Sequence, residues 1–179
     1  MRLNFPQFFT DYLIKRAMRT PYFHLDGYME RYWLVPFNAK YVTLQKDNTG
    51  CYNACPYRQP FTWVLQEFGI GIRIHKILRS DDARAFNNHP WNFISIILKG
   101  KYTEVTPVYD DSDFFAGTNF CSYEQGDVLV RKSNTLHRLV LAKNKPVWTL
   151  FITGKKQRTW GFLTQPKFLT KHYEYDKNV

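Results

Sequence analysis

The pattern of apolar and polar positions changes once along this chain, from a helical period near the start to strand-like segments afterwards. Residues 6–18 begin with a proline and place Phe9, Leu13 and Ala17 at helical spacing, which predicts one amphipathic helix. Pro21 then ends the helical pattern. We therefore expect a helical extension over residues 1–27, ahead of a strand-rich domain.

From residue 28 onward, short segments rich in aromatic and β-branched residues alternate with turn residues, a pattern typical of β-strands. Strands are predicted at 28–35, 40–44, 68–78, 93–98, 102–109, 127–131, 136–141 and 147–153. The segment 47–60 holds Asn, Gly, Cys and Pro without periodicity and is predicted to be a long surface loop. Closely spaced strands favour an antiparallel sandwich or barrel. The chain is thus expected to be mainly β over residues 28–163, with a C-terminal tail at 164–179.

One predicted strand has two chemically different faces. In residues 70–77, isoleucines alternate with Gly71, Arg73 and His75, so the polar face either meets solvent or lines a cavity. In a cavity, the planar guanidinium of Arg73 would suit a carboxylate or phosphate group. Arg73 and His75 are therefore candidates for binding an anionic ligand.

A turn at Gly100 predicts a hairpin between the flanking strand-like segments. With the turn centred there, Ser95 would lie opposite Glu104. Side chains on one face of a strand recur at every second position, so Phe93 and His89 would share this face. The hairpin would therefore bring a carboxylate close to an imidazole.

Composition restricts the partners of the chain. Its 179 residues fit one domain with a sizeable core, and 18% are aromatic, which also suits the wall of a pocket. The formal net charge of +10 favours anionic partners. The basic residues are scattered, however, with only 155–158 forming a short run, which is typical of a solvated surface rather than a nucleic-acid stripe. We expect a small, anionic ligand and no membrane partner. Nucleic-acid binding driven by the net charge is a lesser alternative.

Cysteine usage and targeting signals indicate an unexported protein. Cys51, Cys55 and Cys121 are too few for a disulfide framework, and the first two lack a second pair of zinc ligands. No apolar stretch approaches the length of a membrane span, and the start does not resemble a secretion signal. A cytoplasmic location is expected. Serine-nucleophile and dinucleotide-binding motifs are both missing.

Two glycine-and-histidine segments resemble the two cupin motifs. The first motif runs glycine, five residues, His-x-His, three or four residues, glutamate, six residues and glycine; the second runs glycine, five residues, Pro-x-Gly, two residues, histidine, three residues and asparagine. The matching positions are His89, Gly100, Gly126 and His137, and the positions that differ are Asp81, Asn87, Phe93, Lys132, Asn134 and Leu141. The resemblance implies a cupin-type double-stranded β-helix, or jelly-roll, barrel with a pocket at its mouth.

A narrower resemblance covers residues 28–162 and is to small cupin-like proteins of bacteria and bacteriophages. It rests on 30–33, 73–81, 89–93, 100–104, 153–154 and 160–162. Members of this group commonly read His-Asp-His-Pro-Trp where this chain reads Asn87-Asn88-His89-Pro90-Trp91. Because the group has no settled activity, the resemblance bears on the fold more than on a reaction. If the chain is phage-encoded, the expected location is the host cytoplasm.

The chemical interpretation groups His89, His137 and Glu104 as a two-histidine, one-carboxylate set, which leaves open positions on a divalent ion. Asn87 would add a weak oxygen ligand. Imidazole suits iron, nickel, zinc and copper, so the ligands do not select the ion; iron, nickel, zinc or manganese are the candidates. In the alternative, the two histidines are hydrogen-bonded pocket residues, Glu104 pairs with a nearby arginine or lysine, and no metal binds.

Other aromatic and basic residues have two interpretations each. Trp91 and Tyr102 would stack on a flat or sugar-like ligand or pack in the core. Arg131 and Lys132 would attract anions or, as we expect, form a plain charged turn. The leading function is a pocket for a small molecule, with oxygenase or isomerase chemistry at a metal as its sharper form. The alternative is a non-catalytic cupin-like protein that binds a metabolite, nucleotide or protein partner. Exposed sheet edges would allow a homodimer.

Overall fold

The part of the chain that the structure describes is built mostly of β-strands. The computed structural model describes residues 1–21, 24–25, 27–34, 42–46, 52–56, 68–81, 85–142, 145–165 and 168–171. Its elements are α1 (Gln7–Ala17), β1 (Met29–Trp33), β2 (Val42–Lys46), β3 (Tyr52–Pro56), β4 (Gly71–Ile77), β5 (Trp91–Lys99), β6 (Lys101–Tyr109), β7 (Phe115–Glu124), β8 (Val128–Arg131), β9 (Arg138–Leu141), β10 (Val147–Lys156), β11 (Gly161–Gln165) and β12 (Phe168–Lys171). The predicted N-terminal helix and the mainly β class are confirmed.

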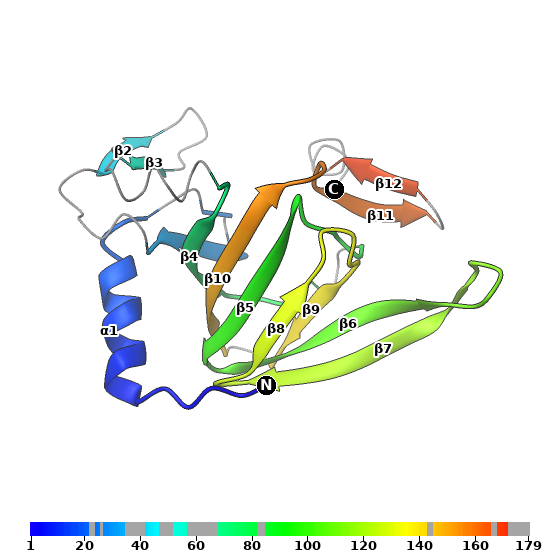
Figure 1. Ribbon diagram of the computed structural model, residues 1–179, viewed down its shortest axis with the longest axis horizontal. Helices are drawn as coiled ribbons and strands as arrows, with labels where there is room; N and C mark the ends of the chain where they lie inside the picture. Colours follow the sequence, from blue (N-terminus) through cyan, green and yellow to red (C-terminus); the bar gives the residue numbers. More distant parts are fainter. Residues whose placement is uncertain are drawn as a thin grey trace.

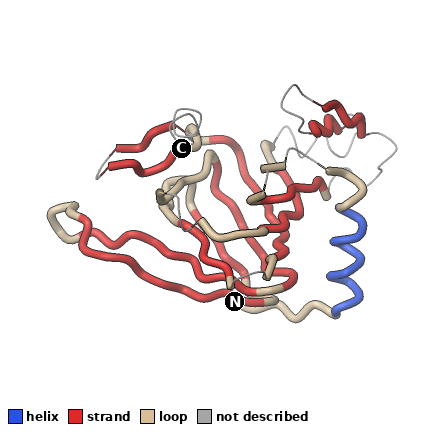
Figure 2. Tube along the Cα trace, turned by 180° about the vertical axis from the view of Figure 1, so that it is seen from behind, coloured by secondary structure: helices blue, strands red, loops and turns tan. Residues whose placement is uncertain are grey.

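Two antiparallel sheets form the body of the fold. The larger has the order β1-β4-β10-β5-β8 and the smaller the order β7-β6-β9. Strands β6 and β7 extend past β9 as a long two-stranded ribbon, on the side opposite α1 (Figures 1 and 2). Two hairpins, β2–β3 and β11–β12, complete the described strands. This arrangement agrees with the predicted jelly-roll architecture.

Alternation along β10 shows how the larger sheet divides its two faces. Thr149 and Phe151 are buried and line a cavity between the sheets. Trp148 and Leu150 point the other way and pack on an apolar cluster with α1. Because side chains of a strand alternate between its faces, one strand serves both the cavity and the helix.

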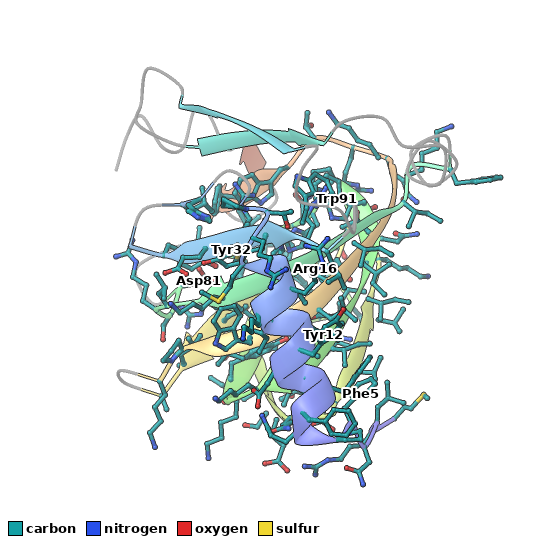
Figure 3. The ribbon with its side chains drawn as sticks, turned by 90° about the vertical axis from the view of Figure 1, so that its left-hand side faces the viewer. Phe5, Tyr12, Arg16, Tyr32, Asp81 and Trp91 are labelled. Carbon is teal, nitrogen blue, oxygen red and sulfur yellow. The ribbon has the colours of Figure 1, made fainter. Side chains whose placement is uncertain are left out.

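Helix α1 covers the outer face of the larger sheet. Ala17 and Ile74 are fully buried in one cluster with Tyr32, Leu34 and Leu98. Figure 3 shows the helix lying across the strands. The apolar face of β4 therefore meets α1, and its polar face, with Arg73 and His75, lines the cavity.

Two local predictions were wrong. The segment 47–60 is not a continuous loop, because β3 lies within it and pairs with β2. The chain does turn at Gly100, where φ is +88°, but β5 and β6 belong to different sheets. Ser95 pairs with Phe151 in β10 and not with Glu104. A glycine with positive φ reverses the chain whether or not the flanking strands pair.

Besides β3, three of the described strands were not predicted at all. Strand β7 pairs with β6 along the ribbon, while β11 and β12 pair with each other near the C-terminus. Strand β12 falls in the predicted tail, the rest of which lies outside the described residues apart from the end of β11. Cys121, on β7, has a free thiol. None of the described helical residues forms a segment long and apolar enough to cross a membrane.

Truncating Ile74 should test the packing of α1 on the sheet. We expect Ile74→Ala to lower the free energy of unfolding by about 3 kcal/mol, because it removes a fully buried side chain and leaves a cavity. Val130→Ala is the control, since Val130 is 67% exposed, and it should change stability by less than about 0.5 kcal/mol. Urea unfolding followed by tryptophan fluorescence measures both, and equal losses would contradict the packing.

Candidate functional site

A cavity of about 130 Å³ lies between the two sheets. Its wall takes side chains from strands of both sheets and from the segment that precedes β5. All eight residues predicted from the sequence line it, namely Arg73, His75, Asn87, His89, Trp91, Tyr102, Glu104 and His137. The structure therefore brings together residues that are up to 64 positions apart in the chain.

His89 and His137 meet inside this cavity. Their Nε2 atoms lie 3.0 Å apart, with the two rings nearly perpendicular at 87°. The backbone explains the meeting, because Asn87 and His137 exchange two N–H···O hydrogen bonds of 2.9 Å. The side-chain amide of Asn87 also donates to the carbonyl of His137 at 3.2 Å. Asn87 thus fixes the position of the histidine pair.

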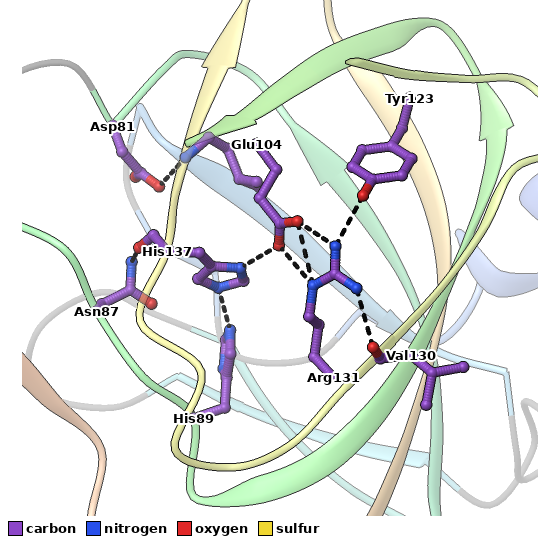
Figure 4. A network of polar contacts seen from close by, with 9 residues as sticks. Asp81, Asn87, His89, Glu104, Tyr123, Val130, Arg131 and His137 are labelled. Atoms are coloured by element: carbon purple, nitrogen blue, oxygen red, sulfur yellow. Dashed lines mark hydrogen bonds and ion pairs between the residues drawn. The ribbon is translucent and has the colours of Figure 1, made fainter. Parts of the chain in front are cut away.

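Glu104 holds the other side of the His137 ring. Nδ1 of His137 lies 2.7 Å from Oε1 of Glu104. The Nε atom of Arg131 donates to both carboxylate oxygens at 3.1 Å, and Nη2 of Arg131 donates to Oε2 as well. Nη2 also lies 2.8 Å from the hydroxyl of Tyr123. A continuous chain of contacts therefore runs from Tyr123 through Arg131, Glu104 and His137 to His89 (Figure 4).

The charge state of Glu104 follows from these contacts. Burial raises the pKa of its carboxyl, but the hydrogen bonds and positive charges of His137 and Arg131 outweigh burial and hold this pKa at about 2. Glu104 is therefore ionised at neutral pH. Since a carboxylate only accepts hydrogen bonds, Nδ1 of His137 carries a proton and donates.

The contact between the two Nε2 atoms requires one shared proton. Burial, together with the neighbouring His137, lowers the pKa of His89 well below its usual range, so His89 is neutral at pH 7. One N–H must lie between the two nitrogen atoms, because two bare nitrogen atoms would repel at 3.0 Å. The two imidazoles are thus joined by a hydrogen bond that contains a single proton.

The predicted metal ligands are adjacent but do not converge on one point. Glu104 lies on the Nδ1 side of His137, away from His89, and both its oxygens are already bonded. Phe93 packs edge-on against His89, with ring centroids 4.7 Å apart. Among the described residues, no group of three or more His, Cys, Asp or Glu side chains is arranged to hold a metal ion. The two-histidine, one-carboxylate set stays a prediction, and in this geometry Glu104 positions His137.

Arg73 and His75 form the opposite end of the cavity. His75 is 8% exposed and stacks on Phe151 with ring centroids 4.6 Å apart. The guanidinium of Arg73 lies over the rings of Trp33 and Trp91, at 4.5 and 5.3 Å from their centroids. Burial, together with the charges of Arg31 and Arg73, lowers the pKa of His75 well below its usual range. His75 is therefore neutral beside two cations.

Tyr102 and Trp91 both line the cavity, and their stacking on a ligand stays a prediction. Tyr102 is buried in an apolar cluster and also lines the cavity. Burial beside Glu104 raises the pKa of its phenol, so Tyr102 stays protonated. Trp91 is half-buried and contacts Arg73. Both contribute to the wall as well as to packing.

Sequence reasoning missed Arg131, which was assigned to a charged turn. Arg131 is the last residue of β8, pairs with Phe93 of β5, and directs its guanidinium to Glu104. The expectation was wrong because the residue closes a strand that faces the cavity. A strand register linking 127–131 to 93–98 would have revealed it. Phe151 was also missed, since an isolated phenylalanine carries no chemical motif.

Comparisons with known proteins found similarity only among solved structures. No family model matches the chain, and no curated protein matches it significantly. Among solved structures, hazelnut (Corylus avellana) vicilin has a TM-score of 0.46 at 12% identity, covering 78% of this chain and 33% of that one. Oxalate decarboxylase from Bacillus subtilis, a protein with Mn(II) centres, has a TM-score of 0.47 at 12% identity, covering 83% and 31%. A cupin superfamily protein from Desulfitobacterium hafniense has a TM-score of 0.35 at 15% identity, covering 49% and 68%.

Of these three solved structures, the one from Desulfitobacterium hafniense is described as a cupin superfamily protein. The chain spans about a third of the length of the vicilin and the decarboxylase. With TM-scores below 0.5 and identities below 25%, the similarities assign no activity to it. Function has to be argued from the site itself.

Replacing Glu104 should test the buried network. We expect Glu104→Gln to lower the free energy of unfolding at pH 7 by about 3 kcal/mol, because Arg131 loses its charge partner. Folding lowers the Glu104 pKa from 4.5 to about 2, so its stabilisation is present above about pH 4.5 and is lost as the pH falls towards 2. The variant should therefore lose less stability than the wild type between these two pH values.

Glu124→Gln is the matched control for this prediction. Glu124 pairs with Arg2 on the surface, with both side chains more than half exposed, so the change should cost less than about 1 kcal/mol. Urea unfolding at a series of pH values measures all three proteins. An unchanged acid dependence in Glu104→Gln would refute the assignment of an ionised Glu104.

Proposed function

We propose that this protein binds a small organic molecule in the cavity between its sheets, and that the His89–His137 pair is the polar centre of the binding site. The observation that carries this proposal is the chain of contacts from Arg131 through Glu104 to the two imidazoles. A buried carboxylate and its partners are costly to desolvate. Such networks therefore favour a functional site over simple packing.

The size and lining of the cavity support a small ligand. A water molecule needs roughly 10–15 Å³ of such space, so the 130 Å³ here corresponds to about ten water molecules. Aromatic side chains, including Phe93, Phe151 and Phe162, make up much of the wall. An apolar wall with a few fixed polar groups is typical of small-molecule sites. The ligand class and the predicted homodimer both remain proposals.

A metal-dependent enzyme of oxygenase or isomerase type is the second candidate, and one specific observation favours it. The two Nε2 atoms face each other at 3.0 Å, and Glu104 supports His137 from behind. A carboxylate that orients a ligating histidine through its other nitrogen is a common feature of metal sites. His89 and His137 would hold the divalent ion, with Glu104 as the positioning group.

The donor set fits this candidate only in part. Catalytic zinc and iron sites use three protein ligands, whereas two imidazole nitrogens are at hand here and Phe93 closes a further side of His89. A bound divalent ion would supply a Lewis acid for a substrate oxygen. The residues themselves orient the ligand, and in the absence of that ion they hold one proton between the two nitrogen atoms.

Ligand binding without metal is the first prediction of this proposal. In a thermal-shift screen of small metabolites and nucleotides, run in excess chelator, we expect at least one organic molecule to stabilise the protein, since binding to the folded state raises its stability. His89→Ala should abolish that shift, because it removes half of the polar centre. His24→Ala is the matched control: His24 accepts a hydrogen bond from the backbone of Arg31 and is not among the residues that line the cavity. Loss of the shift in both variants would argue against a ligand at His89.

Metal titration separates the two candidates. For the metal-dependent form, calorimetry with zinc, nickel or manganese should show one ion per chain, with an affinity that rises with pH because the proton between the imidazoles is released. His89→Ala and His137→Ala should each abolish uptake, and His24→Ala should retain it. No uptake at micromolar metal would remove the metal-dependent candidate and leave the binding proposal intact.

A further inference from the structure

The cavity carries opposite charges on opposite walls. Arg31 on β1 and Arg73 on β4 contribute to one wall, and Glu104 on β6 and Asp81 contribute to the other. Both carboxylates are occupied: Asp81 accepts a hydrogen bond of 2.9 Å from a backbone N–H of β9, and Glu104 is bonded as described above. A ligand that carries a negative group would therefore be oriented with that group towards β1 and β4.

His75 supplies an independent observation at this end of the cavity. It lies directly opposite Arg31 in the β1–β4 pairing, and its side chain is more than nine-tenths buried. Its Nε2 atom is buried and has no hydrogen-bond partner among the described residues. Buried polar atoms are almost always bonded, and an unbonded one costs roughly 1–3 kcal/mol. A ligand atom that bonds this nitrogen would remove that cost.

Trp91 repeats the observation on β5, which is separated from β4 by β10 in the same sheet. Its Nε1 atom is likewise buried without a hydrogen-bond partner among the described residues. An indole N–H can only donate, so the missing partner must be an acceptor. The guanidinium of Arg73 lies 5.3 Å from the Trp91 ring and 4.5 Å from the Trp33 ring. A donor and a fixed cation thus occur side by side.

We propose that Arg73, His75 and Trp91 form a subsite for the carboxylate group of a small organic acid. The inference rests on the proposed small-molecule function of the cavity and names the class of ligand. A carboxylate is planar, as a guanidinium is, and the two groups can form paired hydrogen bonds. Its two oxygens can accept further hydrogen bonds from the indole and the imidazole.

The position of Phe151 defines the rest of the ligand. Its ring lies between the two imidazole centres, with its centroid 4.6 Å from that of His75 and 5.8 Å from that of His89. Phe93 packs beside it, at a centroid distance of 4.8 Å. The acid therefore carries a short apolar or aromatic body along Phe151, and its far end reaches the His89–His137 pair.

A panel of matched ligands tests this subsite. Calorimetry in excess chelator would compare acetate, butyrate, benzoate and salicylate with their neutral amides, and with inorganic phosphate. We expect at least one carboxylate to bind, and its amide to bind about 10- to 100-fold more weakly, because hydrogen bonds to charged groups are worth about 1.5–3 kcal/mol. In nitrogen NMR spectra of the wild type, the carboxylate should shift the Nε2 signal of His75.

Variants on a single strand provide the control. Arg73→Gln should weaken carboxylate binding by about 10- to 100-fold. Lys76→Gln removes the same charge, but Lys76 pairs with Glu30 on the other face of β4 and should change affinity less than about twofold. Thermal unfolding of both variants verifies that each is folded. The His75 signal in the wild type does not depend on either variant.

Four results would overturn the subsite. These are equal affinities for acids and amides, equal losses in Arg73→Gln and Lys76→Gln, and preference for phosphate or no carboxylate binding at millimolar concentration. The broader function would fail differently: no organic molecule, neutral or charged, would shift the nitrogen signals of His89 and His137. If amides shift those signals and the acids bind no more tightly than the amides, the cavity is a binding site but the carboxylate subsite is refuted.

Discussion

The interior of this protein depends on one buried negative charge. Glu104 is 2% exposed, and an unpaired carboxylate at such a position would be neutralised or would destabilise the fold. Arg131 supplies the opposite charge and His137 supplies a further hydrogen bond. The same bond fixes the His137 ring, so that Nε2 faces His89. The requirement to satisfy Glu104 therefore determines the geometry of the histidine pair.

Because polar residues occupy the cavity side of the larger sheet, its outer face has to bury much of the apolar surface. On β4, the inward positions carry Arg73 and His75, so apolar burial has to come largely from the opposite face. Ile74 provides it by packing with Ala17 of α1. The helix is thus more than an extension ahead of the barrel, because it covers the apolar side of a strand whose other side lines the cavity. The sequence pattern of this strand predicted one apolar and one polar face, but it did not show whether the polar face lines the cavity or meets solvent.

Much of the site could be predicted because its anchors are local in sequence. Gly100 and Gly126 were matched by motif spacing, and both adopt positive φ, at +88° and +91°, where other residues are strained. A Cβ on Gly126 would also lie 2.3 Å from the carbonyl oxygen of Leu3. Such backbone requirements leave a clear signal in one sequence. The place of Arg131 depends on pairing between β5 and β8, and the strand β7 has no such anchor; neither could be derived without knowing which strands pair.

The chemistry of the His89–His137 pair depends on the proton that the two imidazoles share. At the position where the first cupin motif has glutamate, Phe93 packs against His89, and where the motif has its first histidine, Asn87 bonds the backbone of His137. In the motif these two positions carry metal ligands. In this chain Phe93 shields the His89 ring, and Asn87 positions His137. Two nitrogen atoms held at 3.0 Å in apolar surroundings share one N–H as long as no ion or ligand replaces that bond. A ligand that accepts or donates at this point must compete with that bond, which links its binding to the protonation of His89.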